Sequence, residues 1–239
     1  MARYKRPAMV IFSLERTLFD ELRLDVRAGV YAVADAMALE GARCDAESLC
    51  EEFVAAQDAL SGTGCVSTEM IWKYLVALFE LRTRRTPALL DRIFCEAACE
   101  PRALEGAADI LELMANRLVR TAVSADIPYS AAWLEDRLDA AFPNHMAEFA
   151  VCSSEFVFRR GDRKYFEIFE RKAGISAADM WYIGSDPVKD VEAAEAAGML
   201  PFWYRGDLPA GGIKPPRCDY SAIGDWRELA AIISELIPF

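Results

Sequence analysis

The chain has 239 residues, of which 54% are hydrophobic and 27% charged, and its formal net charge is −11 at pH 7. These values suit one large domain, or a core with a small second module, and they argue against a disordered chain. The negative charge argues against nucleic acids and anionic membranes as partners. No run of about 18 apolar residues occurs, and Met1–Pro7 is too short and too charged for a signal peptide, so we expect a cytoplasmic protein.

The seven cysteines form no pattern that is typical of metal sites or disulfide frameworks, because no C-x-x-C pair occurs and their number is odd. Cys95 and Cys99 would share one face of a helix, where we expect small buried side chains. The single histidine, His145, follows a turn-like sequence and is expected to have a structural role.

The first expected element is a buried strand at Met9–Phe12, a short run of apolar, β-branched and aromatic residues. Polar residues follow it at once, namely Ser13, Glu15, Arg16 and Thr17. In an open α/β sheet, ligands bind at the carboxyl ends of the strands. This polar cluster therefore marks the expected site.

Residues 21–100 show helical spacing and almost no strand signal. Four helices are expected there, at Leu22–Leu39, from Asp45, from Ser67 to Leu78, and at Ala88–Cys99, with a loop at Ser61–Gly64 before the third. They predict a compact helical domain over residues 21–100, inserted into a core of residues 1–20 and 101–239. Trp72, Tyr74 and Phe79 belong either to the core of this domain or to a ligand site.

From about Glu105 onward, helices and strands alternate. The expected helices are Gly106–Asn116, Ser130–Leu138, Lys164–Ala173, Val188–Ala197 and Trp226–Leu236, and the expected strands are Leu118–Ser124, Glu148–Ser153, Met180–Ile183 and Leu200–Tyr204, with a loop at Gly206–Pro216. This alternation predicts the α/β class, with a parallel sheet that has helices on both faces. The helical insert is expected to form a cap over the strand ends.

Four polar loops at the strand ends carry the candidate chemistry, around Ser13–Thr17, at Ser124, at Gly161–Phe169 and at Gly184–Asp190. Their order resembles the four motifs of the haloacid dehalogenase (HAD) superfamily, over essentially the entire chain. Most members of that superfamily are phosphohydrolases. The resemblance implies a HAD-like Rossmannoid sheet with a helical cap, a Mg²⁺ cofactor and a small phosphorylated substrate.

The resemblance assigns a role to each motif residue. In the first motif, D-x-D-x-T, the first Asp attacks phosphorus and the second is the general acid and base. The implied catalytic residues are Ser13, Glu15, Thr17, Ser124 and Lys164; the implied substrate-binding residues are Arg16, Ser124, Ala125, Arg163 and Lys164; and the implied metal ligands are Glu15, through its carbonyl, Asp186 and Asp190. Arg163 is the alternate to Lys164, because the register of the third motif is uncertain by one residue.

The first motif departs from the family pattern, because Ser13 and Glu15 replace both aspartates. Transfer through an aspartyl-phosphate needs a carboxylate that is ionised at neutral pH, whereas a serine hydroxyl stays protonated. Glu15 could act as a base for Ser13, but a misplacement of ~1 Å can cost ~100-fold in rate. The Mg²⁺ site also loses a ligand, so weak or lost activity is expected.

Basic residues near the strand ends allow a binding role without turnover. These are Arg16, Arg159, Arg160, Arg163 and Lys164, which form either an anion site or ordinary ion pairs. Three hypotheses follow: a HAD-type hydrolase with some activity, a non-catalytic HAD relative that binds a phosphometabolite or a protein partner, and, more weakly, a dehalogenase, whose chemistry also uses the missing aspartate. The substrate and the oligomeric state are not readable from the sequence.

Overall fold

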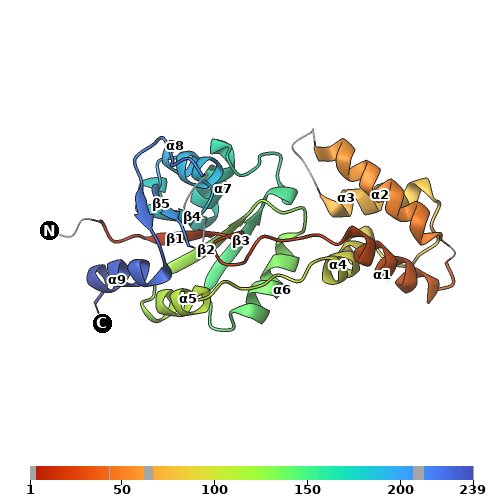
Figure 1. Ribbon diagram of the computed structural model, residues 1–239, viewed down its shortest axis with the longest axis horizontal. Helices are drawn as coiled ribbons and strands as arrows, with labels where there is room; N and C mark the ends of the chain where they lie inside the picture. Colours follow the sequence, from red (N-terminus) through yellow and green to blue (C-terminus); the bar gives the residue numbers. More distant parts are fainter. Residues whose placement is uncertain (1–3, 43, 62–66, 207–212, 239) are drawn as a thin grey trace.

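The computed structural model describes residues 4–42, 44–61, 67–206 and 213–238, and it is built on a sheet of six parallel strands (Figure 1). The strands are β1 (Met9–Ser13), β2 (Arg120–Ala125), β3 (Ala147–Cys152), β4 (Met180–Gly184), β5 (Leu200–Tyr204) and β6 (Ser221–Ile223). Their order across the sheet is β3-β2-β1-β4-β5-β6. The chain thus places β1, and the polar cluster that follows it, at the centre.

Alternate residues of β1 point to opposite faces of the sheet, and each face is covered by helices (Figure 1). Val10 and Phe12 pack in the larger apolar cluster, whereas Met9 and Ile11 pack in the smaller one. The larger cluster includes residues of α5 (Ala107–Asn116), α6 (Ala131–Ala141) and α9 (Trp226–Leu236), and the smaller includes residues of α7 (Arg163–Ala173) and α8 (Ala193–Ala196). The α/β fold with both faces covered is therefore confirmed.

Four further helices lie together at one end of the molecule, beyond the strand ends (Figure 1). They are α1 (Val26–Ala38), α2 (Ala46–Ser61), α3 (Thr68–Leu78) and α4 (Pro87–Ala98). Trp72 is fully buried among them, with its ring 5.5 Å from that of Phe53 and 5.7 Å from that of Phe94. Gly29 lets α1 approach α4 closely, since a Cβ there would lie 2.5 Å from the Phe94 ring. Trp72 therefore belongs to the core of this group of helices. The boundaries of the helical domain at residues 20 and 100 stay a prediction.

The segments that leave and re-enter the sheet beside this group are bonded to each other. The amide of Leu104 donates to the carbonyl of Leu18 at 2.9 Å, and the amide of Asp20 donates to that of Arg102 at 2.8 Å. Phe19 and Ala103 form an antiparallel bridge between these two bonds. We call this pair of segments the connecting ribbon.

Several sequence-based boundaries differ from the structure. Strands β1, β2 and β4 run one residue further than expected, to Ser13, Ala125 and Gly184, so Ser13 lies within its strand rather than after it. The short edge strand β6 was missed, because only three residues with alternating burial form it. Of the expected loops at Ser61–Gly64 and Gly206–Pro216, residues 62–64 and 207–212 lie outside the described residues, and Ser61 is the last residue of α2.

The expected helix at Val188–Ala197 is replaced by a π-helical segment, η3 (Pro187–Glu192), followed by the single turn of α8. The amide of Val191 donates to the carbonyl of Asp186 at 3.2 Å, five residues back, which widens this turn. Such widened turns are frequent at functional sites.

The remaining expectations concern membrane spans, cysteines and the histidine. Among the described helices, none is long and apolar enough to cross a bilayer. Cys95 and Cys99 are buried, as expected. His145 accepts a hydrogen bond from the amide of Ala147 at 3.1 Å and lies 2.9 Å from a carboxylate oxygen of Asp139, which gives it a structural place.

Candidate functional site

The polar ends of β1 and β2 lie side by side in the middle of the sheet. Ser13 is paired in register with Ser124, and the amide of the next residue, Leu14, donates to the carbonyl of Ser124 at 2.9 Å. Both serine side chains are fully buried. The strand pairing therefore brings these two residues together.

Arg160, from the segment before α7, reaches the carboxyl end of β1 beside Ser13. Its Nη1 donates to Ser13 Oγ at 2.6 Å and lies 3.1 Å from Asp190 Oδ1. The side chain of Arg160 is 7% exposed and that of Asp190 is 0% exposed. A single guanidinium group thus joins the first-motif position to the fourth-motif carboxylate.

Asp190 is held by groups on three sides. Its Oδ2 accepts a hydrogen bond from the amide of Asp186 at 2.9 Å, and its Oδ1 accepts one from the Tyr182 hydroxyl at 3.1 Å. Gly184 makes this position possible, because a Cβ there would lie 2.5 Å from the Asp190 side chain. Every oxygen of the Asp190 carboxylate therefore has a protein partner.

Burial and charge act in opposite directions on this ion pair. Burial raises the pKa of Asp190, and the positive charge of Arg160 opposes that shift. Burial is the largest single effect on the pKa of Arg160 and lowers it, but Asp190, Tyr182, Asp126 and Glu15 together outweigh burial, so the pKa of the guanidinium lies above its ordinary value. Arg160 is therefore a permanent positive charge in the site.

Ser124 is surrounded by two buried tyrosines rather than facing an open space. Its Oγ lies 2.9 Å from the Tyr182 hydroxyl and 3.1 Å from the Tyr165 hydroxyl. The Tyr165 hydroxyl also donates to the carbonyl of Val151 at 2.8 Å. Burial raises the pKa of both tyrosines, so both hydroxyls stay protonated. Tyr165 stands where the family pattern has a proline, and its hydroxyl lies within hydrogen-bond distance of Ser124 Oγ.

Glu15 lines a cleft of about 430 Å³ at the ends of the strands, which we call the strand-end cleft. Its wall consists of Glu15, Arg16, Glu21, Arg160, Ser185, Asp186, Pro187, Lys189 and Ile213. Burial raises the pKa of the Glu15 carboxyl, although Arg160 partly offsets this. The backbone carbonyl of Glu15 accepts hydrogen bonds from the hydroxyls of Ser185 at 3.2 Å and Thr17 at 3.3 Å. Thr17 thus supports the loop.

The basic residues near the cleft each have a protein partner. Arg16, at a left-handed φ of 53°, pairs with Glu21 at 3.1 Å. Asp126 accepts from Arg159 and pairs with Lys189 at 3.3 Å. Arg16, Glu21 and Lys189 line the cleft with side chains about half exposed, whereas the carboxylate of Asp126 is buried. The cations of these pairs thus differ from Arg160, whose side chain is 7% exposed.

The structure does not bring Lys164 or its alternate Arg163 to Ser13. Lys164 is exposed, with its Nζ 4.8 Å from the centre of the Phe158 ring, and Arg163 lies 3.7 Å from Glu167. Arg160 contacts Ser13 instead. In the sequence, Arg160 is only one of five basic residues near the strand ends. The helix N-cap at Asp162 fixes where α7 begins, so both Lys164 and Arg163 lie on its first turn.

The implied Mg²⁺ ligands do not fit a divalent cation. Asp190 is bonded to Arg160, Tyr182 and an amide; Asp186 Oδ1 accepts from the amides of Val188 and Lys189; and the carbonyl of Glu15 accepts from two hydroxyls. Within the described residues, no three His, Cys, Asp or Glu side chains are grouped so that they could hold a metal ion.

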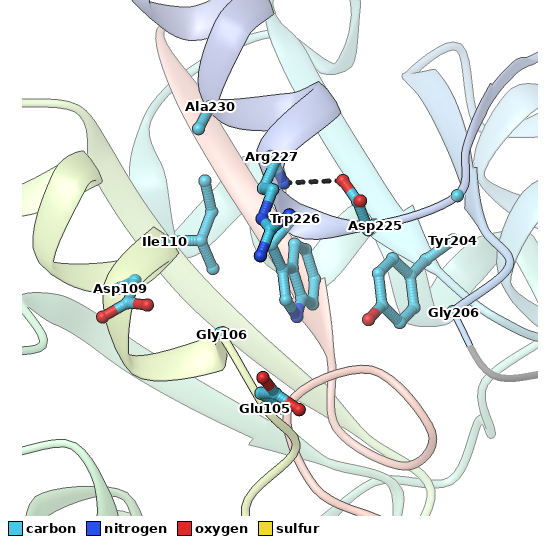
Figure 2. A pocket seen from close by; sticks show the side chains of 11 residues that line it. Glu105, Gly106, Asp109, Ile110, Tyr204, Gly206, Asp225, Trp226, Arg227 and Ala230 are labelled. Carbon is cyan, nitrogen blue, oxygen red and sulfur yellow. Dashed lines mark hydrogen bonds between the residues drawn. The ribbon is translucent and has the colours of Figure 1, made fainter.

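A second cleft, of about 380 Å³, lies between the starts of α5 and α9 and contains none of the motif residues (Figure 2). Trp226 stacks on Tyr204 at its base, with ring centres 4.2 Å apart, and Glu105 lies at its rim. Asp225 accepts a hydrogen bond from the amide of Arg227 at 2.8 Å and so begins α9. Trp226 also contacts Phe12 of β1, with ring centres 5.9 Å apart, and so anchors α9 to the sheet.

No family model and no curated protein matches the sequence. Solved structures do match. A 2-haloacid dehalogenase from Pseudomonas syringae pv. Tomato DC3000 is similar at 19% identity and a TM-score of 0.65, over 95% of this chain and 98% of that one. YfnB from Bacillus subtilis, assigned to the HAD-hydrolases and solved bound to magnesium, has 17% identity and a TM-score of 0.54, over 96% of this chain and 100% of its own. An HAD phosphatase from Thermococcus onnurineus has 13% identity and a TM-score of 0.55, over 94% and 97% of the two chains.

At these identities the likeness shows the fold, which is that of HAD-superfamily hydrolases. The similar structures include both dehalogenases and phosphatases, so they do not select one chemistry. The function has to be argued from the site itself.

Proposed function

We propose that this HAD-fold chain binds a small phosphorylated metabolite in the strand-end cleft without hydrolysing it through a covalent intermediate. The observation that supports this most directly is the state of Ser13. Its hydroxyl is fully buried and accepts a hydrogen bond from Arg160 at 2.6 Å. A hydroxyl that is held in this way by a cationic donor cannot approach a phosphorus atom in the cleft.

The second serine also lacks a free hydroxyl. Ser124 Oγ is fully buried and lies within hydrogen-bond distance of Tyr165 and Tyr182. The two positions that the family resemblance gives to phosphate chemistry are thus engaged in the core. Because a nucleophile needs both an ionised form and a free path to the substrate, ordinary turnover is lost.

The cations that line the cleft support binding. The Arg16–Glu21 pair has side chains 51% and 53% exposed, and Lys189 is 51% exposed in its pair with Asp126. The Arg16–Glu21 pair is exposed on both sides and contributes only about 0–1 kcal/mol, so a phosphate group can replace Glu21 at little cost. The side chain of Asp126 is only 4% exposed, so a phosphate group would bind Lys189 beside that carboxylate rather than in its place. Arg16 would contribute the planar donor pair that suits phosphate, and Lys189 a second positive charge.

Two measurements on the full chain test this proposal. In the first, phosphate release is followed across a panel of phosphorylated metabolites with Mg²⁺, and we expect none above the protein-free rate. Release that is lost in Asp190→Asn would contradict the non-catalytic reading.

In the second, calorimetry measures binding of inorganic phosphate to wild type, Arg16→Ala, Lys189→Ala and Arg82→Ala. Loss of a charged hydrogen bond is expected to weaken binding ~10-fold or more in the first two variants. Arg82 is exposed and does not line the cleft, so its variant is the matched control. Equal affinity in all four proteins would place the phosphate elsewhere.

A second candidate is a residual phosphohydrolase in which Glu15 activates water directly. It is favoured by the position of Glu15 in the cleft and by the burial that raises the pKa of its carboxyl. The expected mark of this activity is phosphate release that survives Ser13→Ala and is abolished by Glu15→Gln. Halide release from 2-haloacids, measured on the same proteins, is expected to be absent, because no carboxylate stands at the Ser13 position.

A further inference from the structure

We infer that the guanidinium group of Arg160 is the resident cation of this site and excludes a divalent metal ion from it. The inference concerns the same strand ends as the proposed function, but it does not depend on which ligand enters the cleft. It rests on the contacts of Arg160 with Ser13 and Asp190 and on the burial of that ion pair.

The position of the charge is the first argument. Arg160 Nη1 lies 2.6 Å from Ser13 Oγ and 3.1 Å from Asp190 Oδ1, and so stands between two of the residues that would otherwise face a metal ion. A divalent cation at the same carboxylate would meet a fixed positive charge at contact distance, in surroundings that screen it poorly. Binding would require Arg160 to leave a buried pair.

The absence of a carboxylate at Ser13 is the second argument. One buried carboxylate, Asp190, is balanced by one buried guanidinium, so the pair is neutral as it stands. An aspartate at the Ser13 position would add a second negative charge. The single positive charge of Arg160 could not balance both that aspartate and Asp190. The serine and the arginine are therefore matched to each other, and they replace the combination of two carboxylates with a metal ion.

The neighbouring arginine provides a control for this reading. Arg159 is adjacent in sequence, but it bonds to Asp126 and its side chain is 37% exposed. It carries the same charge a short distance away without touching Ser13 or Asp190. Removing Arg159 should therefore alter the local field while leaving the cation position filled.

The test measures Mn²⁺ binding by the loss of the free-ion electron paramagnetic resonance signal. The proteins are wild type, Ser13→Asp, Ser13→Asp/Arg160→Met and the matched control Ser13→Asp/Arg159→Met. We expect the Arg160 double variant to bind one Mn²⁺ with an affinity at least ~10-fold higher than that of each of the other three proteins. Its Tm should rise by roughly 3–5 °C at a Mn²⁺ concentration ten times Kd, and the Tm of the other proteins should not.

Stoichiometric Mn²⁺ binding by wild type that is lost in Asp190→Asn overturns the inference, and this measurement needs no engineered site. Failure of a folded Arg160 double variant to bind Mn²⁺ also overturns it. If that variant folds only when Mn²⁺ is added, the metal has replaced the guanidinium, which supports the inference. Wild type that binds Mn²⁺ without releasing phosphate would overturn this inference alone, whereas metal-independent phosphate release would overturn the proposed function alone.

Discussion

At the scale of single residues, the strand-end site is a chain of buried polar groups that are bonded to one another, with only the Nε of Arg160 among them left without a hydrogen-bond partner. Arg160 bonds to Ser13 and Asp190, and Tyr182 links Asp190 to Ser124. Buried polar groups are tolerated when each has a partner, and removing one partner leaves the others unpaired at a cost of about 1–3 kcal/mol each, or more for charges. The network is therefore sensitive to small displacements of Asp190.

Gly184 is the residue that controls this displacement. The change Gly184→Ala would place a Cβ 2.5 Å from Asp190, and we expect it to lower the free energy of unfolding by about 1–3 kcal/mol. Urea unfolding checks this. The control is Gly224→Ala, where the nearest atom is the flexible end of Glu228 at 3.3 Å and little loss is expected. An equal loss in both variants would show that the glycine backbone, rather than Asp190, sets the cost.

The sequence located the site better than it assigned its contacts. Ser13, Ser124 and Asp190 were predictable because parallel strands bring their carboxyl ends to one edge of the sheet. Arg160 was not distinguishable from Arg159 or Lys164, since the loop before α7 has no periodicity that says which side chain turns inward. The path of this loop depends on Gly161, at a φ of 103°, and on the contact of Arg160 with Ser13, which is far away in sequence.

At the scale of elements, long segments with clear helical spacing were predictable, and short or irregular ones were not. Helix α9 was expected with its observed bounds, because its apolar face is regular and Asp225 caps it. Segment η3 was read as an ordinary α-helix, since a single widened turn with five-residue hydrogen bonds is too short to be told from an α-helical turn by its apolar pattern. Strand β6 has only three residues, which are too few for an alternation of apolar and polar side chains to be recognised in the sequence.

Helix α4 carries a buried carboxyl whose titration should be visible in stability. Burial raises the pKa of Asp91 to about 6, although Thr68 and Cys95 partly offset this. A raised pKa means that the folded chain holds a proton that the unfolded chain releases, so stability falls as the pH rises from about 4 through about 6. Above that range, Asp91→Asn should be more stable than wild type by about 2–3 kcal/mol.

Unfolding measured between pH 4 and pH 8 checks this expectation. The stability of Asp91→Asn should lack the fall between pH 4 and pH 6 that wild type shows. The exposed carboxyl of Asp109 provides the same substitution as a control, and Asp109→Asn should keep the wild-type pH profile. A variant of Asp91 that follows the wild-type profile would show that another group titrates in this range.

At the scale of the whole molecule, burial divides the thiols into two classes. Among the residues that the structure describes, Cys95, Cys99 and Cys152 are buried, whereas Cys44, Cys50 and Cys218 are partly exposed. Burial raises the pKa of all six thiols, and raises it far above the ordinary value for Cys95 and Cys152. Because the thiolate is the reactive form, we expect iodoacetamide to modify the buried class at least ~100-fold more slowly until the chain unfolds. Peptide mass spectrometry after timed alkylation measures this. Rapid labelling of Cys152 in the native protein would contradict the burial of β3.

The connecting ribbon has a mechanical consequence for the helical group. Since its two segments are bonded through Leu18 with Leu104 and Asp20 with Arg102, they act as one strap rather than as two independent tethers. A shift of the helical group relative to the sheet would therefore have to move both segments together. Arg16 and Glu21 lie beside these bonds and line the strand-end cleft, so such a shift would also alter that cleft.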